Sequence, residues 1–206
     1  MHVCSIVSTM PHSGKYSLCL KNMKSDAEQW NSLGNNSFVT REVFGPMARC
    51  LTWISVYESF SEAMEKFESS WGSDVFTSII SRIEANPASD IVYPMNLVRS
   101  IYGELKDEYN VDMLRTYSLK RNMLPKAMEM IPRVASMAEK VNLNVTAWAP
   151  ITGEDMSSMT IMYSAKSLKD SGMAMDNMGM SEEFQEIIRA AAEIGDLKSA
   201  YMQVPA

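Results

Sequence analysis

The stretch Ser73–Ile80, with the sequence SDVFTSII, has a counterpart in Ser181–Ile188, with the sequence SEEFQEII. The two stretches start 108 positions apart, and each sets a serine, an acidic residue, a phenylalanine and two isoleucines at the same spacing. A serine followed by acidic residues and then apolar ones is typical of the start of an amphipathic helix. The match therefore indicates that one helix occurs twice in the chain.

Further pairs of matching segments keep the same order along the chain. One match pairs Ile54–Tyr57, which is followed by Ser61, with 160–163, which is followed by Ser167. Another match pairs 44–46 (FGP) with 148–150 (WAP). Tyr93 and Tyr201 again lie 108 positions apart. Small changes of offset fall in expected loops or helix starts, where insertions are tolerated. The pattern predicts a duplicated unit of about 100 residues, the size of a small domain.

The first unit has the pattern of four strands and two helices. From Tyr16 to Trp30, apolar residues recur at the spacing of one helical face. Short β-branched and aromatic runs, bounded by glycine and proline, favour strands. The predicted strands cover 2–9, 38–44, 51–57 and 91–98, and the predicted helices cover 15–33 and 61–86, the second with a break at Gly72.

The second half repeats this order of elements. Its predicted strands cover 113–120, 144–149, 159–163 and 200–204, and its helices begin at Pro125, Ser167 and Glu182, with the last two forming one broken helix. The stretch 103–110 is rich in charge and reads as a linker. We therefore expect two domains, 1–102 and 111–206.

The order β-α-β-β-α-β is that of the ferredoxin-like plait, an antiparallel sheet with both helices on one face. The strand 51–57 carries apolar residues on both faces, so the face without helices also needs cover. The other half can supply that cover. The predicted fold class is α+β, with two tandem ferredoxin-like units packed sheet to sheet as an intrachain pseudo-dimeric α/β barrel.

With this architecture the chain resembles the dimeric α/β-barrel superfamily. The segments 147–150 (AWAP) with Gly153, and 161–164 (IMYS) before a helix that contains Phe184, are similar to the NIPSNAP-like subgroup. The superfamily includes cofactor-independent monooxygenases, haem-dependent enzymes, muconolactone-type isomerases and proteins without known activity. The resemblance implies the fold, and the function must be argued from a site.

Composition narrows the possible partners and the location. The 206 residues carry 19 Lys+Arg and 25 Asp+Glu, a net charge of −6, which is opposite in sign to a nucleic-acid-binding surface. The aromatic pattern of an RNA-recognition strand is not kept in 49–56 either. We see no apolar run of membrane-spanning length and no secretion signal, and three cysteines cannot all pair. We expect a cytoplasmic protein, monomeric or homodimeric, that binds neither nucleic acid nor membrane.

Metal and cofactor sites have little support in the sequence. Histidine, the usual axial haem ligand, occurs only as His2 and His12, although a tyrosine or cysteine ligand stays open. The methionines of 173–180 have a spacing that can bind Cu(I), but adaptable packing in a core gap is the favoured interpretation. We predict no cofactor and no metal.

A small-molecule pocket in the N-terminal half is the favoured hypothesis. Trp53 and Tyr57 share one strand face, and Tyr93 lies on the closing strand of the same unit. These three are the candidate substrate-binding residues, although core packing is the favoured interpretation of the two tyrosines. His12 is the candidate catalytic base, because its ordinary pKa lies near neutrality.

The ligand and the activity follow from the same candidates. The predicted ligand is a small apolar or aromatic molecule, with cofactor-independent monooxygenase or isomerase chemistry as the candidate activity. The alternative is a non-catalytic interaction or stress-response protein. Arg41, Arg99 and Arg115 stand on or beside strands and could orient an anionic substrate, or simply be solvated strand ends.

Overall fold

The computed structural model describes residues 1–206, apart from the side chain of Arg121. The fold is mixed α+β, and both halves follow the predicted order of elements. The first half consists of β1 (Val3–Pro11), α1 (Tyr16–Ser32), β2 (Ser37–Phe44), β3 (Leu51–Tyr57), α2 (Phe60–Trp71), α3 (Asp74–Ala85) and β4 (Ser89–Tyr102). The second consists of β5 (Val111–Leu119), α4 (Leu124–Glu139), β6 (Asn144–Pro150), β7 (Ser158–Ala165), α5 (Leu168–Ala174), α6 (Glu182–Ala192) and β8 (Gly195–Pro205).

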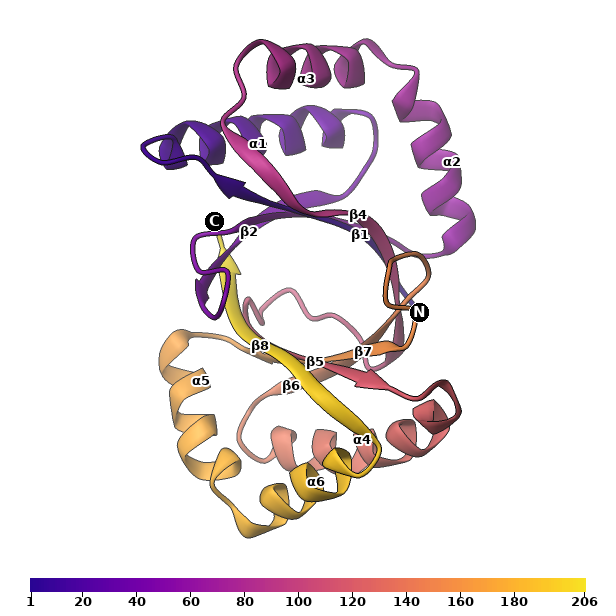
Figure 1. Cartoon of the computed structure of the whole chain (residues 1–206), viewed down its shortest axis with the longest axis vertical. Coiled ribbons are helices and arrows are strands. Elements are labelled where there is room, and N and C mark those ends of the chain that lie inside the picture. The colour runs from indigo at the N-terminus through magenta and orange to yellow at the C-terminus, as the bar shows by residue number, and fades with distance from the viewer.

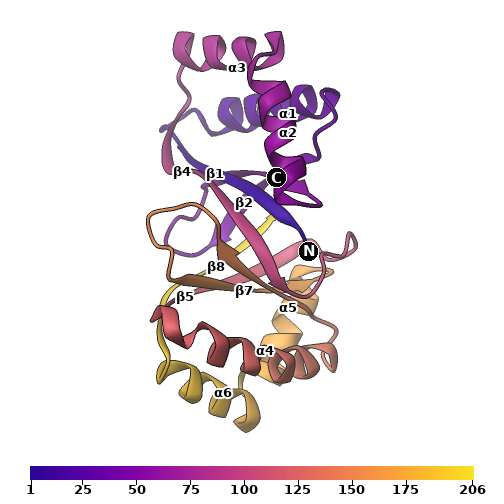
Figure 2. The same ribbon diagram turned by 90° about the vertical axis from the view of Figure 1, so that its right-hand side faces the viewer.

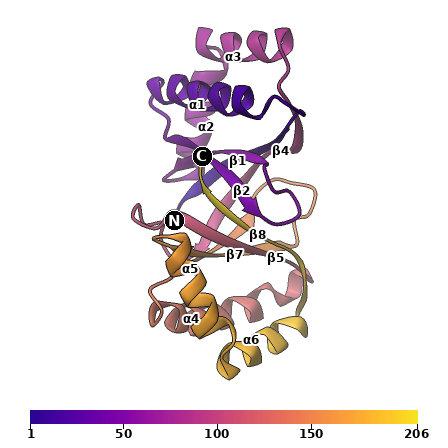
Figure 3. The same ribbon diagram turned by 90° about the vertical axis from the view of Figure 1, so that its left-hand side faces the viewer.

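The described strands close into one antiparallel barrel with the order β1-β3-β2-β8-β5-β7-β6-β4. Within it, β4-β1-β3-β2 and β8-β5-β7-β6 each have the strand order of a ferredoxin-like plait, and the two plaits join through the pairs β2–β8 and β4–β6. Figures 1, 2 and 3 show the barrel in the middle, with the helices of the two halves at opposite ends, outside it. The predicted fold class is confirmed.

Alternation along the strands assigns each side chain to the barrel interior or to the helix-covered face. On β1, Ser8 faces the interior, where its hydroxyl lies 2.9 Å from that of Thr52 on β3. Val7 and Thr9 point the other way, toward the helices. The same parity puts Trp53 of β3 on the helix-covered face.

A polar network crosses one of the two seams inside the barrel. Thr40 of β2 donates a hydrogen bond to Gln203 of β8 at 3.2 Å, and Gln203 donates to Asp112 of β5 at 3.2 Å. Ser164 of β7 also donates to Asp112, at 2.6 Å. Burial raises the pKa of Asp112, and the hydrogen bonds that it accepts from Ser164 and Gln203 oppose the rise. The network therefore ties together strands from both halves of the chain.

Strand pairing extends β4 and β8 beyond their predicted ends. The residues 195–199 include Gly195, Asp196 and Lys198, which are poor strand formers, yet they pair with β5. The beginning of β4 pairs with β1 in the same way. Tertiary pairing overrides local preference at both places. None of the helices in the described part of the chain has the length and apolarity that a membrane span requires.

The connection between β4 and β5 begins at a glycine that no other residue can replace without strain. Gly103 has φ +72°, and a Cβ there would clash with the carbonyl oxygen of Val145. We expect Gly103→Ala to lower the free energy of unfolding by about 2 kcal/mol. Urea unfolding measures this change.

Gly72, between α2 and α3, is the matched control. Its φ is −86° and a Cβ there would meet nothing within 4 Å, so Gly72→Ala is expected to be neutral or stabilising by up to about 1 kcal/mol. Equal destabilisation by both substitutions would contradict the assignment of strain to Gly103.

Candidate functional site

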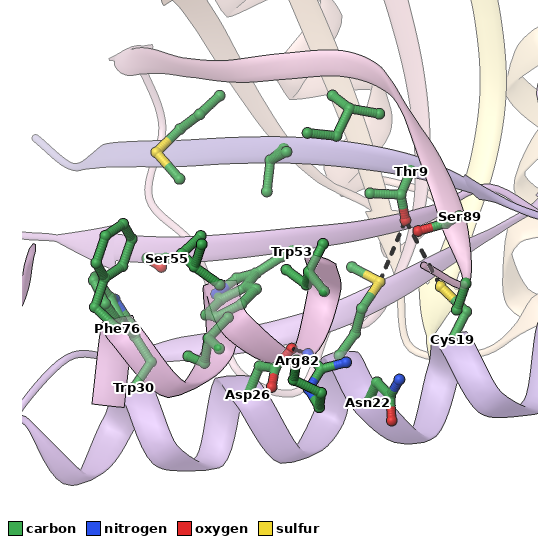
Figure 4. A pocket seen from close by; sticks show the side chains of 18 of the residues that line it. Thr9, Cys19, Asn22, Asp26, Trp30, Trp53, Ser55, Phe76, Arg82 and Ser89 are labelled. Atoms are coloured by element: carbon green, nitrogen blue, oxygen red, sulfur yellow. Dashed lines mark hydrogen bonds and ion pairs between the residues drawn. The ribbon is translucent and has the colours of Figure 1, made fainter. Parts of the chain in front are cut away.

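A cavity of about 220 Å³ lies in the N-terminal half, between the sheet and the helices α1, α2 and α3. The corresponding space in the C-terminal half measures about 50 Å³ and is lined by apolar side chains and two tyrosines. The two halves share a fold, but the space between sheet and helices is filled in one and open in the other. The larger cavity is thus the candidate site (Figure 4).

The position of α3 explains why the first half is hollow. In the second half, Phe184 and Ile187 of α6 are buried in the core. In the first half, Ile79 of α3 is buried, whereas Ile80 and Ile83 stay 37% and 47% exposed. Figures 1 and 2 show α3 beyond α1, on the side away from the sheet. The apolar face of α3 is therefore held off the sheet, and the cavity opens beneath it.

Aromatic side chains make up one end of the cavity. The rings of Trp30 and Trp53 meet edge to face, with centroids 6.2 Å apart and planes at 89°, and Phe76 lies 6.3 Å from Trp30. Phe67 also lines the cavity, with its ring centroid 5.4 Å from that of the exposed Trp71. Rings in such arrangements present both faces and edges to a ligand, which suits a planar aromatic molecule.

Asp26 is the unusual residue of the cavity lining. It projects from α1, is 3% exposed, and forms an ion pair through Oδ2 with the guanidinium of Arg82 on α3 (Figure 4). Its other oxygen, Oδ1, is buried and has no hydrogen-bond partner among the residues that the structure describes. Burial raises the pKa of Asp26 to about 6, and Arg82 opposes the rise. A carboxylate with this pKa can accept a proton near neutral pH.

The other end of the cavity carries sulfur. The Thr9 hydroxyl lies 3.4 Å from the Sδ of Met23 and 4.0 Å from the Sγ of Cys19, both on α1 (Figure 4). Cys50 donates to the carbonyl oxygen of Thr9 at 3.2 Å, and burial raises the pKa of Cys50 to about 11. Cys50 lies outside the cavity lining, and its thiol is protonated near neutral pH.

The structure does not bring the four residues expected at the site into one group. Trp53 lines the cavity, but Tyr57 is buried four residues further along β3, with its ring centroid 5.8 Å from that of Phe67. Tyr93 pairs with Ser8 and so points to the barrel side, because β-bulges shift the register of β4. His12 lies past the end of β1, with its Nε2 3.1 Å from Asp90, and is not part of the lining. The expectation that these four side chains share one cavity is wrong for three of them.

The other sequence candidates also lie away from the cavity. Arg41 and Arg99 are exposed, and Arg115 stacks on the Phe184 ring at 5.9 Å in the other half. In the methionine-rich segment, Met178 is buried, whereas Met173 and Met180 are exposed, so packing explains only part of it. Among the described residues, no three histidine, cysteine or acidic side chains are grouped so as to hold a metal ion.

The sequence holds a signal for Asp26 that is independent of the histidine and tyrosine candidates. Asp26 stands between Met23 and Trp30 at helical spacing, on the apolar face of its helix. An acidic residue on such a face must be buried, and a buried carboxylate needs a partner or a raised pKa. The sequence alone could not show that Arg82, 56 positions away, is that partner.

Comparison with solved structures places the chain in a known fold. An anthrone oxidase-like protein matches with a TM-score of 0.69 and 10% identity, over 100% of this chain and 91% of the other. A candidate monooxygenase from Fusobacterium nucleatum matches with a TM-score of 0.65 and 9% identity, over 100% and 93%. DypB from Rhodococcus jostii, in complex with heme, matches with a TM-score of 0.58 and 9% identity, over 100% and 93%.

At these identities the likeness concerns the fold. The chain has the dimeric α/β-barrel fold expected from its sequence, and the NIPSNAP-like assignment stays a prediction. No family model matches the chain, and no curated protein matches it either.

The cavity does not fit the haem found in one of these relatives. Neither His2 nor His12 lines it and its lining contains no tyrosine, so of the histidine, tyrosine and cysteine ligands of haem the lining offers only the buried Cys19. Its volume of about 220 Å³ also lies below the roughly 300–1,000 Å³ of ordinary ligand pockets. The mostly apolar, aromatic lining and the small volume of this cavity instead suit a small ring system.

Proposed function

We propose that the protein binds an apolar aromatic molecule in the cavity of its N-terminal half, and that Asp26 removes a proton from it in a cofactor-independent oxygenation. The observation that carries the proposal is the buried carboxylate of Asp26, with one oxygen unpartnered, in an otherwise mostly apolar, aromatic-walled cavity. A buried charge lowers stability, so its presence in a cavity wall is best explained by chemistry.

The proposed reaction needs an acidic C–H or O–H group and dioxygen. For an anthrone, Asp26 takes a proton from the ring methylene, and the resulting carbanion gives its electrons to O₂. The methylene becomes a carbonyl, one oxygen atom stays in the product, and the other leaves as water. The edge-to-face tryptophans would hold the rings, and the Arg82 guanidinium beside Asp26 would favour its charged, proton-accepting form.

Binding can be followed through the protein's own fluorescence. Trp30, Trp53 and Trp71 all line the cavity, so a ring system placed there is expected to quench their emission saturably. The volume of about 220 Å³ exceeds the roughly 150 Å³ that accommodates benzene, so two of the three rings of an anthrone fit inside and the third lies at the opening of the cavity. We expect a dissociation constant in the micromolar range for anthrone. The absence of saturable quenching would contradict the proposal.

Oxygen uptake then separates the candidate activities. A monooxygenase consumes O₂ in proportion to anthrone, an isomerase converts its substrate without O₂, and a non-catalytic binding protein does neither. The fold of the relatives named as a candidate monooxygenase and an anthrone oxidase-like protein supports the first. Binding without O₂ consumption would leave the protein as an isomerase or a ligand carrier and overturn the oxygenase.

The remaining features of the chain fit the same proposal. We propose that 1–102 and 111–206 are two domains that arose by duplication, and that one kept an open cavity. The barrel closes within one chain, so a monomer suffices. The free, buried cysteines suit a reducing cytoplasm.

A further inference from the structure

The rim of the cavity differs in character from its interior. Ile80 and Ile83 of α3 and Ile91 and Met95 of β4 line the cavity and are nevertheless 37–68% exposed. Trp71 of α2 is the aromatic member of the same exposed rim. Inside, Trp30 and Phe67 are almost fully buried. The cavity thus passes from an aromatic interior to a largely aliphatic opening.

Exposed aliphatic side chains gathered at one opening are unfavourable in water unless something covers them. The counterpart of this rim in the second half is covered, because α6 packs on its sheet there and Ile188 and Ala191 are partly buried. In the first half α3 stands off from the sheet, and the uncovered residues Ile80, Ile83, Ile91 and Met95 belong to the wall of the cavity. An occupant of the cavity that reached its opening would therefore cover the rim.

We propose that the natural ligand has an aromatic head group with an unbranched aliphatic tail, the head lying beside Asp26 and the tail running out between α3 and β4. This inference rests on the proposed function and adds the substrate class. The enclosed volume of about 220 Å³ takes one or two rings, so a longer molecule must extend over Ile83 and Ile91. Apart from Asp26 and Arg82 the lining is uncharged, so the tail meets no charge on its way out.

Binding of a homologous series of phenols tests this placement. Phenol, 4-propylphenol, 4-pentylphenol and 4-heptylphenol share a head group and differ in tail length, and quenching of tryptophan fluorescence reports their dissociation constants. Each methylene that leaves water on the rim is expected to tighten binding about two- to fourfold. The gain should stop once the tail extends past the rim.

Variants of the rim assign the gain to this surface. Ile83→Ser and Ile91→Ser alter exposed side chains, which the fold tolerates. They are expected to reduce the gain per methylene to less than twofold and to leave the affinity for phenol within twofold. Leu197→Ser, an equally exposed position on β8 outside the lining, is the control and should keep the full gain.

The possible outcomes separate the two proposals. If phenols and anthrone alike fail to quench, both the proposed function and the tail are overturned. If phenol binds and the longer phenols bind no more tightly, the aromatic site stands and the tail is overturned. If the longer phenols do bind more tightly and the serine variants keep that gain, the tail lies elsewhere and its placement between α3 and β4 is overturned.

Discussion

Replacing Asp26 by asparagine is expected to lower turnover of anthrone at least 100-fold while leaving its dissociation constant within a few-fold of the original. General-base catalysis contributes about 10²–10⁴ to a rate, and the amide accepts no proton at neutral pH. The substitution keeps the shape of the side chain and the aromatic walls of Trp30 and Trp53. Oxygen uptake measures turnover and tryptophan quenching measures binding. Unchanged turnover would contradict the role of Asp26.

The pH dependence of the reaction gives a second readout of the same group. With a pKa of about 6, Asp26 is protonated and inactive as a base below that pH, so activity should rise through about pH 6. In Arg82→Gln the nearby positive charge is gone, the charged carboxylate is less favoured, and the rise should move to higher pH. If activity rises at the same pH in Arg82→Gln as in the original protein, a group other than Asp26 titrates.

The same carboxylate should make the protein less stable at neutral pH than at low pH. The pKa of Asp26 in the folded chain, about 6, lies above its ordinary value of 3.8. The folded state therefore binds the proton more tightly than the unfolded state does. The stability due to this group is fully present below about pH 4 and is lost as the pH rises through about 6, by up to about 3 kcal/mol.

Asp26→Asn is expected to remove this loss of stability at neutral pH. We expect the variant to unfold at higher urea concentration than the original protein at pH 7.5, and the difference to shrink as the pH falls toward 4. A site that trades stability for chemistry shows this combination of lower activity and higher stability. If the variant were less stable than the original at pH 7.5, the ion pair with Arg82 would outweigh the burial of the charge.

The fold could be predicted because its determinants are local and repeated. Apolar residues at helical spacing from Tyr16 to Trp30 and the alternation of the strand 51–57 each specify an element, and two copies in the same order specify the plait. The ends of the strands could not be predicted from the sequence, because Gly195–Ser199 becomes a strand only by pairing with β5. Local composition carries no information on such a partner.

The site could be predicted in part, for a different reason. The N-terminal half and Trp53 could be inferred from the inequality of the two copies, since Trp53 has no counterpart in the second. The cavity itself depends on α3 standing off the sheet, which no periodicity encodes. The two bulges in β4 turn Tyr93 to the barrel side, so a parity argument that is correct for β3 fails on β4.

Trp53 and Tyr57 lie on the same strand face, and their substitutions are expected to have opposite consequences. Trp53→Ala removes a cavity wall that also packs on Trp30, and should lower the free energy of unfolding by about 3 kcal/mol and weaken anthrone binding about 30-fold. Urea unfolding and tryptophan quenching measure the two effects.

Tyr57→Phe is the matched control for Trp53→Ala, because Tyr57 lies in the core outside the cavity lining. The Tyr57 hydroxyl is buried and has no hydrogen-bond partner among the described residues, while its ring packs on Phe67. Removing the hydroxyl ends the unfavourable burial of a polar group, so we expect stability to rise by up to about 1 kcal/mol, with binding and turnover unchanged. If Tyr57→Phe instead lowered turnover, the hydroxyl would have to reach the substrate. The substrate site would then extend past Phe67 and include Tyr57.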